Sequence, residues 1–155
     1  MADQVESAAW SPDGARIATA NQSGPIRVWD ATTGEELVTF AEDQPYAVSW
    51  SPDGSRIAIA DVASTGGGAT VWDAATGEML LDLFPENLTF GVGAVAYSPD
   101  GTRIAYTASG DPEGTQIFVR WMDDEGATSQ ITRLESSPSG IRWSPDGEHL
   151  SFTMN

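Results

Sequence analysis

The chain contains one histidine, His149, and no cysteine or lysine. A Ser-His-Asp triad or a histidine-based metal site would therefore have to use His149. Without cysteine, the chain has no thiolate nucleophile, no thiolate zinc site and no disulfide. Without lysine, the run Gly66-Gly67-Gly68 lacks the side chain with which a Walker loop reaches phosphates. The remaining candidates for chemistry are His149 and the carboxylates.

The position of His149 favours a structural role. It lies two residues after Gly147, just as Arg16, Arg56 and Arg103 lie two residues after their own turn glycines. A position that arginine fills elsewhere in a repeat is a polar strand position, and no geometric context marks it as a base. No Gly-x-Ser-x-Gly elbow accompanies it. We therefore expect no catalytic residue and no enzymatic activity.

Carboxylates could act as metal ligands where several lie close together. Residues 111–114 (Asp-Pro-Glu-Gly) and 123–125 (Asp-Asp-Glu) are short acidic turns of this kind. We interpret both as solvated charge. Four other aspartates recur at one position of a repeated turn, which indicates that they form the turn: Asp13, Asp53, Asp100 and Asp146. We therefore expect no bound metal and no cofactor.

The elements that must position any site are set by a four-residue repeat, Ser-Pro-Asp-Gly. It begins at Ser11, Ser51, Ser98 and Ser144, at spacings of 40, 47 and 46 residues. Proline presets φ at the second turn position, aspartate suits the third, and glycine takes the left-handed conformation. Apolar runs flank each copy, so each copy is predicted to be a hairpin turn. A period of 40–47 residues is typical of a β-propeller blade.

The predicted fold is all-β, a segment of a β-propeller with four-stranded antiparallel blades. The strands are short and rich in valine, isoleucine and aromatic residues with alanine between them, which suits sheets stacked face to face. Closed propellers have about four to eight blades, so about three and a half blades should form an open arc. The expected single domain spans 1–155, with blades at about 5–40, 46–84 and 92–134 and a half-blade at 141–153.

Two further motifs carry a family resemblance. Val28-Trp29-Asp30 and Val71-Trp72-Asp73 each precede a Thr-Gly-Glu turn. Together with Ser-Pro-Asp-Gly, they resemble the motifs of the WD-repeat β-propeller family. In the third unit, residues 118–123 and 130–132 are more similar to blades of Tol-system periplasmic propellers and oligopeptidase propeller domains.

Aromatic residues that recur in register are interpreted as structural anchors of the blades. One stands before each Ser-Pro-Asp-Gly turn, and others end the third strands. The anchors before the turns are Trp10, Trp50, Tyr97 and Trp143, and those in the third strands are Trp29, Trp72 and Trp121.

Binding should use the loops that join the blades and the middle strands, because loops vary in function while the repeat stays constant. Tyr46 and Phe90 are the aromatic residues of these loops that we expect to be exposed for a partner. The loops are 41–46, 85–91, 135–140, 21–24, 62–68 and 109–115.

The composition excludes several partners. The formal net charge is −16, which repels phosphate backbones and anionic lipid, so we expect no nucleic acid and no membrane. No apolar run is long enough to span a bilayer. Residues 1–6 lack the basic and apolar regions of a signal peptide, which predicts a cytoplasmic location. A periplasmic or secreted location would follow if the chain is an internal fragment.

The resemblance implies a non-catalytic module for protein–protein interaction or scaffolding, part of a longer propeller. The alternative is the propeller portion of a larger oligopeptidase-like or Tol-like periplasmic protein, which gates or docks while the chemistry lies elsewhere. Either reading predicts protein partners at the loops. The open ends of the arc should be covered by the remaining blades or by self-association.

Overall fold

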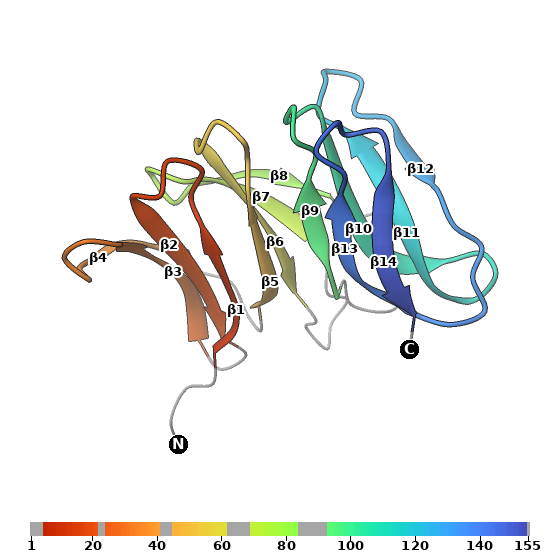
Figure 1. The fold of residues 1–155 in the computed structure, drawn as a ribbon, viewed down its shortest axis with the longest axis horizontal. Helices are drawn as coiled ribbons and strands as arrows, with labels where there is room; N and C mark the ends of the chain where they lie inside the picture. The colour runs from red at the N-terminus through yellow and green to blue at the C-terminus, as the bar shows by residue number, and fades with distance from the viewer. Residues whose placement is uncertain (1–4, 22–23, 41–44, 62–68, 84–92, 155) are drawn as a thin grey trace.

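The computed structural model describes residues 5–21, 24–40, 45–61, 69–83 and 93–154. These residues form fourteen β-strands in four antiparallel sheets. They contain no helix, and so no helical segment that could cross a membrane. Figure 1 shows the sheets side by side in chain order, with the first and the last at opposite ends. The predicted all-β arc of propeller blades is confirmed.

Each of the first three sheets is a meander of four strands, and the last sheet has two. The first blade consists of β1 (Val5–Trp10), β2 (Arg16–Asn21), β3 (Gly24–Asp30) and β4 (Glu36–Phe40). The second consists of β5 (Pro45–Trp50), β6 (Arg56–Asp61), β7 (Ala69–Asp73) and β8 (Met79–Asp82). The third consists of β9 (Val95–Tyr97), β10 (Arg103–Gly110), β11 (Gly114–Trp121) and β12 (Thr128–Gln130). The half-blade consists of β13 (Pro138–Trp143) and β14 (Leu150–Met154).

Each Ser-Pro-Asp-Gly turn is closed by its own hydrogen bonds. In the second copy, the Ser51 hydroxyl donates to Asp53 Oδ1 at 2.6 Å and accepts from the Arg56 N–H at 2.9 Å. The Gly54 N–H donates to the Ser51 carbonyl at 2.9 Å. Gly54 has φ +70°, a conformation that favours glycine. The same bonds recur in the other three copies, so four residues set each hairpin locally.

The two faces of a blade differ in the size of their side chains. The face that a blade turns toward the next blade has fully buried alanines on its second strand, such as Ala18 and Ala20 of β2, beside larger residues of the later strands, such as Phe40. The face of the next blade that packs against these alanines carries large residues, such as Trp50, Ile57 and Trp72. Small residues on one sheet leave room for the large ones of its neighbour, and dense packing requires such a fit.

The same arrangement recurs along the arc. Ala58 and Ala60 of the second blade receive Ile104 and Tyr106 of the third. Ala105 of the third blade lies in a smaller cluster with residues of the half-blade: Ile141, Trp143, Leu150 and Phe152.

Within the part of the chain that the structure describes, no sheet covers the large-residue face of the first blade. Trp10 is 62% exposed, whereas its counterpart in the second blade, Trp50, is 7% exposed. Trp29 and Trp72 pair with equivalent isoleucines in their sheets. Trp72 is buried between two blades, and Trp29 is only half-buried. Trp10 therefore packs against no second sheet among the described residues, and its role as a blade anchor stays a prediction.

The third blade departs from the first two in register. Ile104, the isoleucine after the turn arginine, pairs with Arg120, so Arg120 occupies the position of Trp29 and Trp72. Trp121 pairs one residue further along and therefore points to the opposite face, where it is partly exposed. The register thus separates Trp121 from Trp29 and Trp72, and its role as a blade anchor stays a prediction.

Truncating Trp29 and Trp72, which occupy equivalent strand positions, should show how much packing against a neighbouring blade contributes to the free energy of unfolding. We expect Trp72→Ala to lower the free energy of unfolding by about 3–5 kcal/mol, because it opens a cavity between two packed sheets. Trp29→Ala should cost clearly less, since one side of its ring already faces solvent. Urea-induced unfolding followed by circular dichroism measures both. Equal losses of unfolding free energy in the two variants would contradict the conclusion that Trp29 lies on a face that no neighbouring blade covers.

Candidate functional site

Neighbouring blades are joined by a repeated polar contact beside the Ser-Pro-Asp-Gly turn. At the first junction, Trp50 Nε1 donates to the Ala9 carbonyl at 3.0 Å. The Arg16 guanidinium lies over the Trp50 ring, 4.7 Å from its centroid, and its Nη2 donates to the Gly54 carbonyl at 2.9 Å. One arginine therefore combines a cation–π contact with a hydrogen bond across the junction. We call this arrangement the arginine latch.

The last junction has the same latch. Trp143 Nε1 donates to the Ala96 carbonyl at 3.1 Å. Arg103 lies 4.8 Å from the Trp143 ring centroid and donates to the Gly147 carbonyl at 2.9 Å. The arginine two residues after each turn glycine is thus a structural residue at two junctions.

His149 occupies the position of these arginines in the half-blade. Its side chain is exposed, and its Nδ1 lies 4.0 Å from Asp146 Oδ1. Asp146, Glu148 and His149 form an exposed group of potential metal ligands. Asp146 Oδ1 already accepts hydrogen bonds from the Ser144 hydroxyl and the Glu148 N–H. The geometry therefore resembles the repeated turn rather than a built metal site.

The middle junction lacks the latch and contains a cavity of about 460 Å³. Tyr97 takes the place of the tryptophan, and its N–H donates to the Ser49 hydroxyl. The Tyr97 hydroxyl is buried, and it has no hydrogen-bond partner among the described residues. Burial raises the pKa of this phenol well above its usual range. The tyrosine thus fills less of the junction than the indole does elsewhere.

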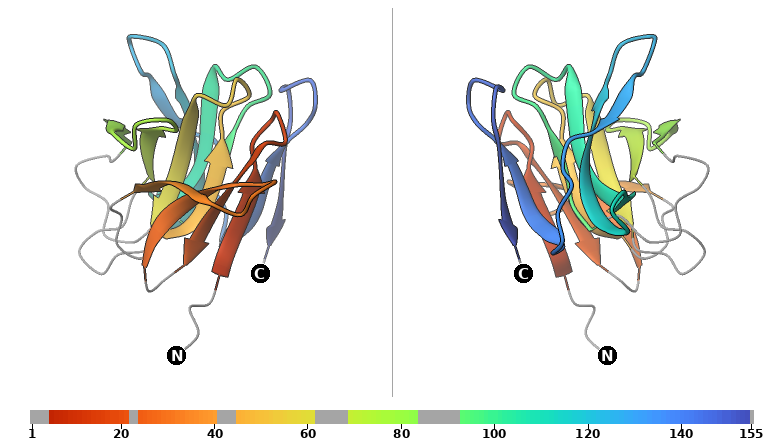
Figure 2. Two further views of the ribbon diagram at one scale, coloured as in Figure 1. Left: turned by 90° about the vertical axis from the view of Figure 1, so that its left-hand side faces the viewer. Right: turned by 90° about the vertical axis from the view of Figure 1, so that its right-hand side faces the viewer.

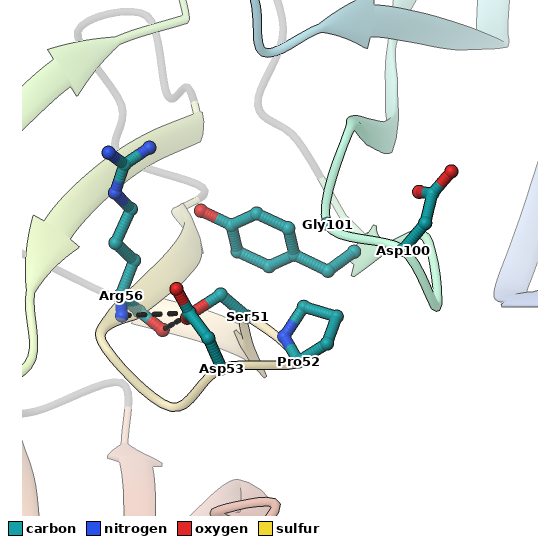
Figure 3. Close-up of a pocket in the computed structure, with 7 residues that line it drawn as sticks. Ser51, Pro52, Asp53, Arg56, Asp100 and Gly101 are labelled. Atoms are coloured by element: carbon teal, nitrogen blue, oxygen red, sulfur yellow. Dashed lines mark hydrogen bonds between the residues drawn. The ribbon is translucent and has the colours of Figure 1, made fainter.

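Arg56 is also displaced at this junction. Its guanidinium makes no hydrogen bond or ion pair with the described part of the chain, and Arg56 is exposed. Figure 3 shows that it points away from the turn formed by Ser51, Pro52 and Asp53, while Gly101 and Asp100 line the opposite side of the cavity. The three arginines thus share one sequence position, but only two of them form the latch.

The carboxylates of the cavity stay ionised at neutral pH. The pKa of Asp53 is lowered to about 2, chiefly because the Ser51 hydroxyl donates to it and then because the Ser55 N–H does. Asp100 has its pKa lowered to about 2 by the Ser98 hydroxyl and the Thr102 N–H. A carboxylate with so low a pKa is a poor general acid or base at neutral pH. The cavity is therefore better suited to binding than to proton transfer.

The predicted loop site is only partly within the described residues. Tyr46 lies in β5 and is 41% exposed, although most residues of this strand are buried or half-buried. Phe90 lies outside the described residues, so its expected exposure stays a prediction. The predicted binding side is the edge of the arc opposite the Ser-Pro-Asp-Gly turns. Its described connections join β10 to β11 and β12 to β13 (Figure 1).

The same side carries a polar network in the third blade that the sequence did not predict. The Gln116 side chain is fully buried, and its Nε2 donates to the Leu134 carbonyl at 2.9 Å. Its Oε1 accepts from the Thr132 hydroxyl at 2.9 Å and from the Leu134 N–H at 2.8 Å. Arg133 pairs with Asp111 at the surface. A glutamine directly before the apolar run Ile117-Phe118-Val119 was the available signal, because a buried amide needs such partners.

Removing a latch arginine should destabilise the chain only where the latch exists. We expect Arg16→Met to lower the free energy of unfolding by about 1–3 kcal/mol, through loss of a cation–π contact and a cross-junction hydrogen bond. Arg56→Met, at the same repeat position, should change it by less than about 0.5 kcal/mol. Chemical denaturation of the two variants checks this. A larger loss for Arg56→Met would refute the role given to the latch.

Acid should destabilise the turns. Because the folded-state pKa values of Asp53 and Asp100 are lowered, their contribution is fully present above the unfolded value of 3.8 and is lost as pH falls through about 2. The melting temperature should therefore fall over this range, and Asp53→Asn should lower it at neutral pH and flatten the acid fall. Asp124→Asn, which removes one charge outside these turns, is the control. A melting temperature independent of pH in this range would contradict the prediction.

Comparisons with known proteins agree with the geometry. Residues 2–51 match the family model described as the anaphase-promoting complex subunit 4 WD40 domain. Periodic tryptophan protein 2 of Saccharomyces cerevisiae is 53% identical over 38 residues, which cover 24% of this chain and 4% of that protein.

Solved structures resemble nearly the whole chain. Kuenenia stuttgartiensis hydrazine synthase matches with a TM-score of 0.77 and 24% identity over 97% of this chain and 44% of that one. TolB from Acinetobacter baumannii matches with a TM-score of 0.78 and 22% identity, and the match covers 97% of this chain and 37% of that one. The Cps50 (Swd1) β-propeller domain of Myceliophteria thermophila matches with a TM-score of 0.78 and 14% identity, and the match covers 99% of this chain and 49% of that one.

The chain thus spans less than half the length of these solved chains. At such identities the structural likeness shows the fold, while the match to the family model concerns the first blade. Residues 2–51 are thus similar in sequence to a WD40 domain, and the chain as a whole has a β-propeller fold.

Proposed function

We propose that the chain is a non-catalytic propeller module that binds a protein partner through its blade-connecting side, and that it forms part of a longer propeller. The observation that carries the proposal is Tyr46, an aromatic residue exposed in a strand that is otherwise mostly covered. Aromatic residues dominate the binding energy of protein interfaces because they bury a large area with little loss of conformational freedom. The rigid blades behind Tyr46 would hold it in one position.

The chemistry of the described residues supports a binding role. The single histidine is exposed at a structural position, and the carboxylates of the middle junction are fixed by turn hydrogen bonds. The turn serines do donate to carboxylates such as Asp53 and Asp100, but the pKa of each of these carboxyl groups is lowered to about 2, so they are poor bases for activating a nucleophile. The net charge of −16 favours a basic protein surface over nucleic acid or anionic lipid.

A site-specific crosslink tests the proposal. The natural protein that contains this chain would carry a photo-crosslinking p-benzoylphenylalanine at position 46, and a matched one at Leu37, an exposed residue of β4. We expect a discrete protein adduct from position 46 and not from position 37. Tyr46→Ala should reduce recovery of that partner at least about tenfold, the effect of truncating an interface hot spot. No adduct at position 46, or the same adducts from both positions, would reject the proposal.

The alternative is that the chain is the propeller portion of a larger oligopeptidase-like or Tol-like protein. The shifted register of the third blade and the likeness to TolB favour it. In that case the propeller docks or gates, and chemistry lies in another domain. Sequencing the DNA on both sides of the coding segment distinguishes the two. A hydrolase domain or a secretion signal would favour the alternative, and further blades alone would favour the scaffold.

A further inference from the structure

Two junctions show where a guanidinium lies between neighbouring blades. At the first one, Arg16 lies over the Trp50 ring and donates to the Gly54 carbonyl at 2.9 Å. Its Nη2 also lies 4.0 Å from Asp13 Oδ2, a carboxylate oxygen of its own turn. The last junction repeats these three contacts around Arg103. A guanidinium at this place therefore contacts an aromatic face, a turn carbonyl and a carboxylate.

The middle junction provides the same three groups around its cavity. By their positions in the repeat, Tyr97 supplies the aromatic ring, Gly101 the carbonyl and Asp53 the carboxylate. All three residues line the cavity of about 460 Å³. Arg56, the arginine of this repeat position, is exposed and points away from the turn (Figure 3). The cavity thus takes the place of the guanidinium that the other two junctions contain.

The walls of the cavity keep the spacing of an occupied junction. In every view of Figures 1 and 2, the turn between β5 and β6 lies beside the turn between β9 and β10. A Cβ added to Gly54 would lie 3.6 Å from Pro12 Cδ and 3.3 Å from Arg16 Nη2. A Cβ added to Gly101 would lie 3.4 Å from Pro52 Cδ, and among the described residues it would meet no arginine within 4 Å. The two pairs of turns are equally close, so the middle junction has the room of the first without its guanidinium.

The polar groups of the cavity suit a cation that donates hydrogen bonds. Tyr97 is 9% exposed, and its hydroxyl oxygen has no hydrogen-bond partner among the described residues. The turn hydrogen bonds of Asp53 all go to Oδ1, which leaves Oδ2 as an acceptor. Asp100 adds a second carboxylate, which Arg103 approaches to 3.9 Å. Among the described lining residues, Arg56 is the one cation, so the lining is net negative.

We propose that the middle junction binds the side chain of an arginine from a basic segment of a partner protein. The guanidinium lies on the Tyr97 ring, donates to the Gly101 carbonyl and pairs with Asp53. A guanidinium suits these groups better than the ammonium group of lysine, because it is planar, stacks on aromatic rings and carries its donors in a fixed geometry. The formal charge of −16 attracts a basic segment and disfavours a free amino acid, whose α-carboxylate is negative.

This site is separate from the one proposed around Tyr46. The cavity lies at the edge of the arc that carries the Ser-Pro-Asp-Gly turns, whereas the predicted binding side is the opposite edge (Figure 1). Both blades that form the cavity lie within the chain. The proposal therefore does not rest on the proposed function, and a negative crosslinking result at position 46 leaves it unaffected.

Blocked amino acids test the chemistry of the site. N-acetyl-arginine amide carries the guanidinium of a peptide-bound arginine, N-acetyl-lysine amide has an ammonium group, and N-acetyl-citrulline amide is a neutral analogue of similar shape. Saturation-transfer difference NMR on the natural protein that contains this chain measures their dissociation constants. We expect the arginine compound to bind at least about tenfold more tightly than the citrulline compound and at least about threefold more tightly than the lysine compound.

Free arginine distinguishes a protein partner from a small molecule. It carries the same guanidinium together with an α-carboxylate, so we expect it to bind no more tightly than the blocked compound. Tighter binding of free arginine would identify a small-molecule site and would overturn the proposal of a protein partner. Equal binding of the arginine and citrulline compounds would overturn the proposed role of the charge.

Matched variants locate the site. Asp53→Asn removes one charge from the cavity and should weaken binding of the arginine compound at least about fivefold. Asp13→Asn makes the same change at the same position of the first turn, where Arg16 already forms the latch, and should alter binding less than about twofold. Circular dichroism confirms that both variants fold. Absence of binding by the unmodified protein, or equal weakening by the two variants, would show that the cavity is not the site.

Arg56 itself is the competing occupant. Arg56→Met removes a positive charge from the rim of the cavity and should strengthen binding of the arginine compound or leave it unchanged. If only Arg56→Met binds the compound, Arg56 fills the latch in solution and the partner proposal is wrong. Weaker binding by Arg56→Met would also contradict a cation in the cavity, and this holds even if Asp53→Asn does not fold.

Discussion

The structure depends on the fit between a small-residue face and a large-residue face at each blade junction. Alanines such as Ala18 and Ala58 let the next sheet approach closely, and large residues such as Ile57 and Trp72 fill the space. Because the alanines and the large residues that they receive lie on opposite faces of a sheet, the blades stack in one direction. The arginine latch adds a polar contact at the rim of two junctions, but the buried apolar surface supplies the main stabilisation.

The middle junction shows how far this packing tolerates change. Tyr97 keeps the aromatic contact with the second blade but lacks the indole N–H, and Arg56 does not reach the Gly101 carbonyl. The apolar cluster between these blades is nonetheless complete, with Ile104 and Tyr106 fully covered. The cavity beside Asp53 and Asp100 therefore lies at the junction where tyrosine occupies the position that tryptophan holds at the other two, and the fold does not depend on the latch there.

The sequence predicted the strands and turns well because their causes are local. Ser-Pro-Asp-Gly closes through its own hydrogen bonds, so its position alone fixes a hairpin. It did not predict the register of β11, which follows from cross-strand pairing that places Arg120 where tryptophan was expected. Nor did it predict that residues 131–134 run beside β11 through Gln116 and Thr132 rather than as a regular strand. The exposure of Tyr46, in a strand whose other residues are mostly covered, depends on packing between strands and not on the local sequence alone.

The one-way stacking of the faces has a geometric consequence. Each junction joins two different surfaces, so the same rotation is applied from blade to blade. Interfaces of this kind generate a ring when the rotations sum to a full turn and an open helical array when they do not. The number of blades in a closed assembly is therefore decided by the angle that alanine-on-tryptophan packing imposes at each step. Changing the size of one residue at Ala58 or Ala105 would alter the angle at its own junction, while the other junctions and the hairpin turns would stay as they are.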